Sequence, residues 1–439
     1  MTTRQALTLL RRYESRNVTF MEPDGSWPIV WERARGTRVW DAAGRVYLDL
    51  TAAFGVAAAG HANPRVLAAG QRQMGRLLHA MGDVHPHKLK ARLARELSRV
   101  TFERWSRSGR KKSAAGKTIF CNSGFEAVEV ALKTARLATG KRGVIGFEGA
   151  YHGLGYGALN LTHRGLFRDS FRDQLGQFGH FVPYPSTDHE LDSVTSKISS
   201  LLRRRAIGAV LIEPVQARGG IRVPDPSFLA RLRDLCDRHG ALLIVDEIYT
   251  GFGRTGTWFA AEHSGVAPDL ICLGKALTGG FPLSACVGRA EVMDAAWPPS
   301  TGEAIHTSTF LGHPVGCAMA LAQIEEIRTQ RLVQRSAELG KFLLEALRSQ
   351  VTHHRLRIDV RGLGMLAGIE LIQPDGAPAT AAALAAIKAM LHRGFILLPE
   401  GEHANVISFS PPLTISRREL ERTVTALNEV LSAPRGSAA

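Results

Sequence analysis

The strongest constraint on the fold of this chain is a regular alternation of strand-like and helix-like segments between residues 118 and 287. Short apolar runs bounded by Gly, Pro or Asp predict strands, and the segments between them carry apolar residues at helical spacing. The predicted strands are 143–147, 206–215, 241–248, 270–273 and 282–287. Such alternation is typical of a mostly parallel sheet with helices on both faces. The sequence therefore predicts an α/β fold.

Two of the predicted helices have clear ends. Apolar residues at helical spacing run through 124–139 and 226–239, and Gly140 and Gly240 follow directly. Glycine just after a helix is a common stop signal. With a predicted strand on either side, the helix at 226–239 completes a strand–helix–strand unit.

Beyond residue 315 the composition changes to long Ala- and Leu-rich segments with helical spacing. This pattern predicts a smaller α+β domain. The start of the chain contains hairpin-like strands outside the main sheet. We expect three parts: residues 1–60 as an N-terminal segment that contributes to the small domain, 61–320 as the large domain, and 321–439 as the C-terminal small domain.

The chain carries 55 Lys and Arg against 40 Asp and Glu, a formal net charge of +15. An excess of this size makes a nucleic-acid-binding protein one hypothesis. The charges are dispersed, however, and the densest clusters, at 104–117 and 203–205, lack zinc-finger spacing and RNA-binding aromatic motifs. A Gly-, Ser- and Lys-rich cluster is typical of a solvated loop. We therefore predict that the chain has no nucleic-acid partner, and we keep nucleic-acid binding as an alternative.

The five cysteines are odd in number, widely spaced and mostly set in apolar runs. They predict buried free thiols in a reducing compartment, and neither a disulfide framework nor a metal site. No apolar run reaches the length of a membrane span, and the N-terminus lacks the apolar core of a signal peptide. The sequence thus predicts a cytoplasmic protein that binds neither a metal nor a membrane.

The first candidate for chemistry is the segment 122–126, which opens the helix at 124–139. Small residues at a helix N-terminus let backbone N–H groups approach a phosphate, and the helix dipole favours its negative charge. Ser123 followed by Glu126 also matches a capping box, which needs no ligand. The residues alone leave both interpretations open.

The second candidate is the pair Asp246 and Glu247 at the end of a hydrophobic strand. A carboxylate at a strand end can keep a heterocyclic nitrogen protonated, and the alternative is a surface acid at the start of a loop. The run 251–256 matches GxGxxG in letters. A dinucleotide fingerprint, however, joins a strand directly to a helix, and an acid ends the next strand. Here the next strand leads to a lysine, so dinucleotide binding is not predicted.

That lysine, Lys275, is the third candidate. It follows the apolar strand 270–273 and is flanked by glycines. Most lysines are exposed surface residues, which is the alternative here. An amine at the end of a buried strand can be desolvated, which lowers its pKa and allows it to form a Schiff base.

In this order the three candidates resemble fold-type-I pyridoxal-5′-phosphate (PLP) enzymes, and the motifs are similar to those of class III aminotransferases. The resemblance covers residues 28–430. It implies a large PLP-binding domain with a mostly parallel sheet, plus a smaller α+β domain. The matching segments are Asn122 to Lys133, Tyr151-His152-Gly153, Glu213 to Gln216, Asp246 to Gly256, 274–280 around Lys275, Thr307-Ser308-Thr309, Arg361 to Gly364 and Pro411 to Leu413.

The resemblance implies roles for four residues around the cofactor ring. Lys275 would form a Schiff base with PLP and then move a proton between the substrate carbon and the cofactor. Asp246 would pair with the pyridinium nitrogen, so that the ring accepts electrons. Tyr151 would stack on one face of the ring, and Ile248 would pack on the other.

The resemblance also implies contacts around the phosphate. Ser123, Gly124 and Phe125 would surround it, with backbone N–H groups donated by Gly124 and Phe125. Family members often carry Thr, Ser or Ala at position 125, so only the backbone contact is carried over to Phe125. Thr309 would reach the phosphate of a neighbouring subunit, which predicts a homodimer with shared active sites.

Four further residues concern the cavity and the substrate. Glu213 and Gln216 would line the cavity near the 3-hydroxyl of the ring, and Gln216 is also a candidate for substrate contact. Relatives that act on ornithine-type or 4-aminobutyrate substrates usually carry an Arg where Ser408 stands, to clamp a carboxylate, and often a gating Glu where Arg218 stands. We hypothesise that Arg218 helps to hold the carboxylate of an acidic donor or product. The alternative is a surface arginine on a loop.

The predicted function is that of a PLP-dependent aminotransferase, which moves an amino group between an amine or ω-amino acid and a 2-oxo acid through pyridoxamine phosphate. Class III also contains amino-acid racemases, epimerases and a 2,1-aminomutase. All of these would need Lys275 and Asp246, so the sequence leaves the chemistries open. The expected partners are a small amino donor, a 2-oxo acid acceptor and a second copy of the chain.

Overall fold

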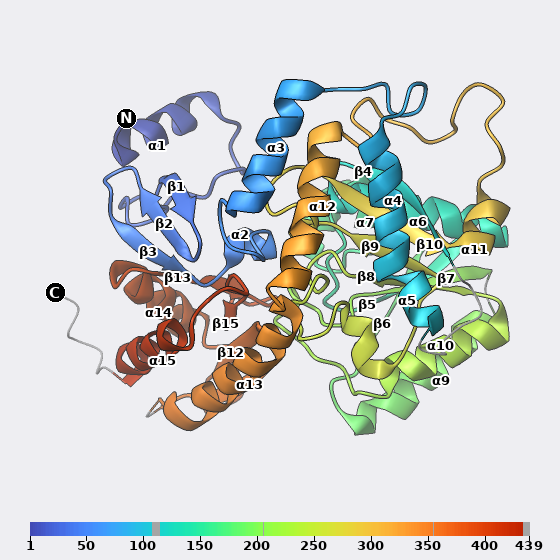
Figure 1. Cartoon of the computed structure of the whole chain (residues 1–439). Coiled ribbons are helices and arrows are strands. Elements are labelled where there is room, and N and C mark those ends of the chain that lie inside the picture. Colours follow the sequence, from blue (N-terminus) through green and yellow to red (C-terminus); the bar gives the residue numbers. More distant parts are fainter. Residues whose placement is uncertain (108–114, 205, 354, 433–439) are drawn as a thin grey trace.

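The computed structural model describes residues 1–107, 115–204, 206–353 and 355–432 (Figure 1). Its central element is a seven-stranded sheet in the order β4-β10-β9-β8-β7-β5-β6. Strands β5 to β9 pair in parallel, and β10 is antiparallel to both β4 and β9. The predicted α/β fold with a mostly parallel sheet is confirmed. The strands are β4 Gly116–Cys121, β5 Gly143–Phe147, β6 Gly179–Val182, β7 Ile207–Ile212, β8 Leu242–Asp246, β9 Leu270–Leu273 and β10 Ser284–Arg289.

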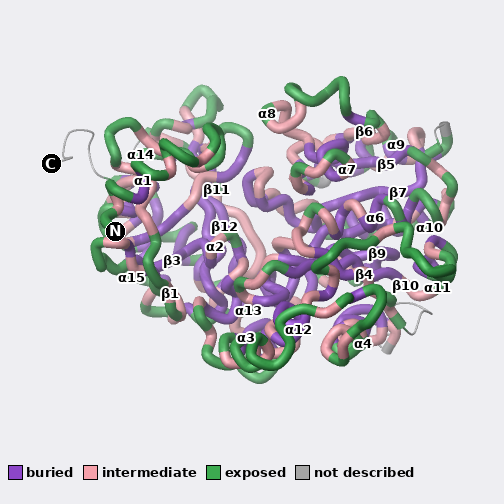
Figure 2. The backbone as a smooth tube through the Cα atoms, turned by 90° about the horizontal axis from the view of Figure 1, so that it is seen from above, coloured by how far each residue is buried: buried purple, intermediate pink, exposed green. Residues whose placement is uncertain are grey.

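Helices cover both faces of this sheet, because successive residues of its central strands are apolar and buried. Val210 and Ile212 of β7 pack into the core with α9 and α10, whereas Ala209 and Leu211 pack into the core with α6 and α11. Figure 2 shows the buried backbone concentrated along the strands. The elements around the sheet are α4 Lys88–Val100, α5 Phe102–Arg107, α6 Gly124–Thr139, α7 Tyr156–Leu159, α8 Gly165–Arg168, α9 Asp188–Arg204, α10 Phe228–His239 and α11 Ala290–Ala296, with the 3-10 turns η1 Asp169–Gln174, η2 Ala260–Ser264 and η3 Lys275–Leu277.

Local sequence explains where α6 and α10 begin and end. The Glu126 carboxylate accepts the N–H groups of Asn122 and Ser123, at 2.7 and 3.2 Å, and so closes the start of α6. Gly140 and Gly240 follow the two helices with φ of 67° and 60°, a left-handed conformation that costs glycine little. The predicted ends of both helices are confirmed.

Two long helices, α3 Pro64–Arg76 and α12 Pro314–Thr329, pack side by side next to the large sheet (Figure 1). His313 is the N-cap residue of α12, just before Pro314, and its Nδ1 accepts the N–H of Val315 at 3.3 Å. A ring nitrogen therefore does the capping work that an Asn side chain performs in other helices. Proline at the first helical position needs no acceptor for an N–H group.

The two ends of the chain meet in small sheets beside the large one. Strand β13, from the C-terminal part, pairs in parallel with β3, from the N-terminal part. One sheet has the order β1-β2-β3-β13 and another has the order β11-β12-β15-β14. These strands are β1 Trp31–Arg35, β2 Arg38–Asp41, β3 Val46–Asp49, β11 Arg357–Leu363, β12 Leu366–Ile372, β13 Phe395–Ile396, β14 Leu398–Glu400 and β15 Val406–Phe409; the accompanying helices are α1 Thr3–Tyr13, α2 Ala52–Gly55, α13 Leu332–Gln350, α14 Thr380–His392 and α15 Arg417–Ser432.

The largest hydrophobic cluster is shared by the large sheet and these terminal parts. It runs from Leu48 in β3 through Phe120 in β4 to Phe409 in β15. The division into residues 1–60, 61–320 and 321–439 stays a prediction.

The glycine run at 251–256 is a loop that joins the large sheet to the C-terminal part of the chain. Arg254, in the middle of the run, is buried, and its Nη1 donates to the carbonyls of Met365 and Pro411 at 3.1 and 2.5 Å. Burial lowers the pKa of this guanidinium to about 10. The run therefore holds two parts of the chain together and does not open a dinucleotide-binding helix.

All five cysteines are free and buried. Within the ranges that the structure describes, no helix combines the length and the apolar character that crossing a bilayer requires.

Candidate active site

Five of the predicted site residues come together at one edge of the large sheet. Because β5, β7, β8 and β9 are parallel, their carboxyl ends lie at the same edge, and ligands bind at this edge in open α/β sheets. Tyr151 follows β5, Glu213 follows β7, Asp246 ends β8 and Lys275 follows β9. Ser123 lies after β4, which runs in the same direction because β10 is antiparallel to both of its neighbours.

Lys275 is partly buried and has an unusual backbone conformation. Its φ of 22° lies at the margin of the left-handed region, where residues other than glycine are strained, and such strain often marks functional positions. Its Nζ lies 4.8 Å from the centre of the Tyr249 ring. Burial lowers the pKa of the amine, and the carboxylates of Asp246, Glu213 and Glu400 act in the opposite direction. A lowered pKa leaves more of the amine uncharged and able to react.

Asp246 is buried and held by two donors. Its Oδ2 lies 2.8 Å from Nδ1 of His152, and its Oδ1 accepts the N–H of Ile248 at 3.1 Å. An ionised carboxylate only accepts hydrogen bonds, so the proton of the His152 ring sits on Nδ1. His152 is fully enclosed, and it fixes the orientation of Asp246. His152 had no predicted role, although it lies in the aromatic-His-Gly segment, which was the signal for it.

The start of α6 has the features of an anion site. The N–H groups of Gly124 and Phe125, in its first turn, have no acceptor within the helix. The Ser123 hydroxyl is buried, and no other group of the described residues forms a hydrogen bond with it. A Cβ atom at Gly124 would lie 3.0 Å from Cγ2 of Ile248, so the backbone there is closely packed. Free donors, an unpaired hydroxyl and the helix dipole fit a phosphate group.

Phe125 departs from the small residues that are common at this position. Its backbone lies in the first turn of α6, but its side chain is exposed. The ring packs over the turn that follows Tyr151, where a Cβ at Gly153 would lie 2.3 Å from the Cβ of Phe125. The side chain thus covers the edge of the site and offers no hydroxyl.

Tyr151 and Ile248 are placed by contacts on their outer sides. The N–H of Tyr151 donates to Oε1 of Glu213 at 2.9 Å, and its ring meets Phe167 edge to face with centroids 5.5 Å apart. Ile248 packs against both Gly124 and the backbone before Lys275, since a Cβ at Gly274 would lie 3.2 Å from its Cγ2. The predicted roles of Tyr151 and Ile248 as the two walls of the ring site stay predictions.

Glu213 is fully buried and bonded to the backbone. Besides Tyr151, it accepts the N–H of Ala217 at 3.3 Å. Burial raises its pKa to about 7, and the neighbouring Asp246 adds to this increase. Gln216 is also buried, but its side-chain amide donates to the carbonyl of Glu148 at 2.9 Å and lies 3.4 Å from Nη1 of Arg222. The structure therefore shows Gln216 joining two loops, and a contact with substrate stays a prediction.

Thr309 is exposed and belongs to a segment that reaches the start of α6 in the same chain. Ser308, beside it, accepts a hydrogen bond from the Asn122 side chain at 3.3 Å. A single chain does not test the predicted contact of Thr309 with a neighbouring subunit.

Ser408 and Arg218 lie close to this group. The Ser408 hydroxyl donates to the carbonyl of Leu398 at 3.0 Å, so it is committed to the backbone of the neighbouring strand. The Arg218 guanidinium lies 5.4 Å from the centre of the Tyr151 ring, and its Nε lies 3.6 Å from Oε2 of Glu400. Arg218 thus faces the site and is not a surface arginine without partners. Sequence reasoning missed Glu400, because no motif includes it.

Glu247, next to Asp246, has a structural role that depends on pH. Its carboxylate is buried and accepts the Thr250 hydroxyl and the N–H of Ala261. Burial raises its pKa from 4.5 to about 7. A carboxyl group with a raised pKa in the folded state contributes stability below its unfolded pKa, and this contribution is lost as the pH rises through the folded pKa.

We predict that wild type loses roughly 2 to 3 kcal/mol of unfolding free energy relative to Glu247→Gln between pH 5 and pH 8. Urea denaturation of both proteins without added cofactor at the two pH values measures the difference. The exposed Glu345→Gln serves as the control and is expected to follow wild type. Parallel pH dependence of wild type and Glu247→Gln would contradict the prediction.

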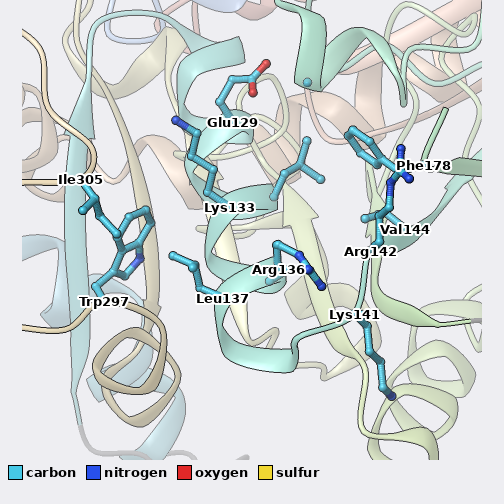
Figure 3. Close-up of a pocket in the computed structure, with 14 residues that line it drawn as sticks. Glu129, Lys133, Arg136, Leu137, Lys141, Arg142, Val144, Phe178, Trp297 and Ile305 are labelled. Atoms are coloured by element: carbon cyan, nitrogen blue, oxygen red, sulfur yellow. The ribbon is translucent and has the colours of Figure 1, made fainter. Parts of the chain in front are cut away.

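A separate hollow of about 510 Å³ lies over the outer face of α6. Figure 3 shows Trp297 and Ile305 on one side of it and Phe178 and Arg142 on the other, with α6 between them. Its described lining includes none of the predicted site residues. The hollow is therefore distinct from the group around Lys275.

Known proteins resemble this chain over nearly its whole length. The family model for class III aminotransferases matches residues 20–431. The 5-aminovalerate aminotransferase DavT of Pseudomonas aeruginosa is 39% identical over 92% of this chain and 93% of its own length. The 4-aminobutyrate aminotransferase GabT of Escherichia coli is 36% identical over 92% of this chain and 93% of its own length.

Solved structures show the same similarity. The ornithine aminotransferase from Toxoplasma gondii superposes with a TM-score of 0.84 at 28% identity and covers 98% of this chain and 95% of that chain. Another structure of that enzyme has PLP at partial occupancy at its active site. An aminotransferase from Bacillus anthracis superposes with a TM-score of 0.88 at 26% identity, over 98% and 99% of the two chains.

Proposed function

This chain belongs to the class III aminotransferases, and from that premise we propose that it moves an amino group between an amine or ω-amino acid donor and a 2-oxo acid acceptor. The observation that carries the proposal is the partly buried amine of Lys275, with its lowered pKa, at the strand edge where Asp246 is held by His152. A reactive amine and a fixed carboxylate at neighbouring strand ends are what amino transfer needs.

The residues at this edge fit PLP. When bound, PLP supplies an aldehyde that binds amines covalently and a protonated ring that accepts the electron pair released at the substrate carbon. The start of α6, with the free Ser123 hydroxyl and the N–H groups of Gly124 and Phe125, would hold its phosphate. Asp246 would face the ring nitrogen, and Lys275 would hold the cofactor covalently through Nζ.

The remaining residues of the site would orient the cofactor ring and enclose it. Asp246, fixed by His152, keeps a proton on the nitrogen that it faces, because its negative charge stabilises the protonated form. Tyr151 and Ile248 would restrict the ring from its two sides and exclude water. Lys275, once its amine is free and uncharged, would move a proton between the donor carbon and the cofactor carbon that receives the amino group.

We further propose that the protein acts as a homodimer. Exposed apolar side chains gather on two segments that touch each other, since the rings of His79 and Phe310 lie 5.3 Å apart and Thr307 donates to Asp83 at 2.6 Å. An exposed apolar surface of this kind is typical of a protein interface. Thr309, in the second segment, would then reach the phosphate site of the partner. The apolar residues are Leu77, Leu78, Met81, Val84, Ile305 and Phe310.

A cytoplasmic location is part of the proposal, because buried free thiols suit a reducing compartment.

A half-reaction tests the proposal. The PLP-loaded protein, given an ω-amino acid in excess without any 2-oxo acid, is expected to release one carbonyl product per subunit, and addition of a 2-oxo acid is expected to restart turnover. Light scattering of the same sample is expected to give twice the mass of the chain. Exchange of the substrate α-proton with solvent, without carbonyl product, would instead identify a racemase or epimerase. A rearranged amine without carbonyl product would indicate an aminomutase.

A further inference from the structure

The carboxylate that faces Arg218 comes from a distant part of the sequence. Glu400 ends β14, and β14 pairs with β15 so that Leu398 lies opposite Ser408 and Glu400 opposite Val406. The N–H of Gly401 donates to the carbonyl of Arg218 at 3.2 Å, which joins the two backbones beside the site. The β14–β15 pair has Ser408 in place of a clamping arginine. It therefore brings the carboxylate of Glu400 close to Arg218 on the opposite loop.

The contact between the two side chains is loose. Nε of Arg218 and Oε2 of Glu400 are 3.6 Å apart, within ion-pair range but beyond a hydrogen bond. This Nε is buried, and no acceptor among the described residues forms a hydrogen bond with it. The Glu400 side chain is 3% exposed, whereas that of Arg218 is 32% exposed. Arg218 thus has a neutralising partner and also donors that a further carboxylate can use.

We propose that Glu400 is the internal counter-ion of Arg218 and determines which substrates the site accepts. Glu400 neutralises Arg218 while the bound amine carries no carboxylate. When the carboxylate of an amino acid or 2-oxo acid enters, that carboxylate replaces Glu400 as the partner of Arg218. The proposal rests on the proposed amino transfer, in which one site must accept two different substrates in turn.

The cost of unpaired charge explains why such a partner is useful. An enclosed charge without a partner is unfavourable, so Arg218, whose Nε is buried, would on its own disfavour a donor that has no carboxylate. Glu400 alone would repel every carboxylate. A loose pair avoids both penalties, because a substrate carboxylate can bind the arginine fork in a bidentate geometry that Glu400 does not reach.

When a substrate carboxylate replaces Glu400 as the partner of Arg218, we expect Glu400 to bind a proton, and this uptake can be measured. The charged and titratable neighbours of Glu400 are Arg218, Lys275, Arg164, Tyr151 and Tyr249. Burial raises the pKa of Glu400 to about 7, although Arg218, Lys275 and Arg164 lower it. When a substrate carboxylate binds Arg218, Glu400 loses that stabilisation and gains a negative neighbour. Its pKa rises further, and the carboxyl group binds a proton near pH 7.

Chain-matched donors test the selectivity. Hexylamine and 6-aminohexanoate differ only in the terminal carboxylate, and kcat/KM for each is measured with the PLP-loaded enzyme. We expect Arg218→Ala to lower the preference for 6-aminohexanoate by roughly tenfold or more, because a charge-assisted contact is lost. Glu400→Gln is expected to shift the preference in the opposite direction, since the arginine is left unneutralised. Glu402→Gln, an exposed neighbour with the same change of charge, is expected to keep the wild-type ratio.

A binding measurement without turnover completes the test. Titration calorimetry of glutarate at pH 7, in buffers of different ionisation enthalpy, is expected to show proton uptake by wild type and none by Glu400→Gln. Equal shifts for both donors in Glu400→Gln, or unchanged proton uptake, would overturn the role of Glu400 while amino transfer stands. A wild-type enzyme that releases no carbonyl product from any donor would overturn the proposed function and this inference with it.

Discussion

Replacing Lys275 with alanine is expected to lower kcat for amino transfer by about 10⁴-fold, the upper end of what a positioned proton carrier contributes. Its Nζ is a partly buried amine, with a lowered pKa, at the edge of the sheet beside Asp246. Alanine removes both the covalent anchor for PLP and the base at the donor carbon. The steady-state rate with an ω-amino acid and a 2-oxo acid, together with the visible absorbance of the PLP-loaded protein, measures both losses.

The fold is expected to survive this change. A desolvated amine stabilises little, so Lys275→Ala should keep the melting temperature of the cofactor-free protein, or raise it. Lys341→Ala, in an exposed lysine, is the matched control and should keep wild-type activity. Activity of Lys275→Ala within about tenfold of wild type would contradict the assigned role.

Ser123 was a candidate in the sequence because it opens a predicted helix, and Lys275 and Asp246 were candidates because each lies at the end of a predicted strand. In a parallel sheet this position alone brings distant residues to one edge. The local pattern therefore singled out these residues as candidates, whereas their roles were implied by the resemblance to the family. Glu213 falls inside the predicted strand 206–215, and only the resemblance singled it out; in the structure it follows β7.

Glu400 and His152 could not be predicted in the same way. Glu400 reaches Arg218 only because the short strands β14 and β15 pair, and such pairing depends on contacts that no local pattern encodes. His152 lies in a recognised segment, but its bond to Asp246 crosses from the end of β5 to the end of β8. The antiparallel β10 and the pairing of β3 with β13 were missed for the same reason.

Some of the arginines of the chain are buried and have structural roles. Arg254 bonds to two carbonyls that join distant parts of the chain, and Arg233 is paired with Asp269 at 2.6 Å. Arginine suits such positions because its planar fork presents several donors and stays charged. These two arginines hold distant parts of the fold together.

Asp246→Asn is expected to lower kcat by about 10³-fold, the size of effect seen when one preorganised electrostatic contact to a developing charge is removed. The two side chains have nearly the same shape, and the amide oxygen can still accept the proton on Nδ1 of His152. What is lost is the negative charge that holds a proton on the facing ring nitrogen. The loss should fall mainly on kcat and much less on KM, which steady-state kinetics with one donor and one acceptor separates.

The surroundings of Asp246 make this change easy to interpret. Its carboxylate is buried and meets its donors within the chain, at Nδ1 of His152 and at the N–H of Ile248, so an amide replaces it without opening a cavity. Asp192→Asn, in a side chain that is 85% exposed, is the control for the change of charge and should keep wild-type kinetics. The single amide oxygen can keep the bond to His152, whereas the NH2 group cannot accept the N–H of Ile248. An Asp246→Asn enzyme with an unchanged kcat would show that the charge beside His152 has no part in the reaction.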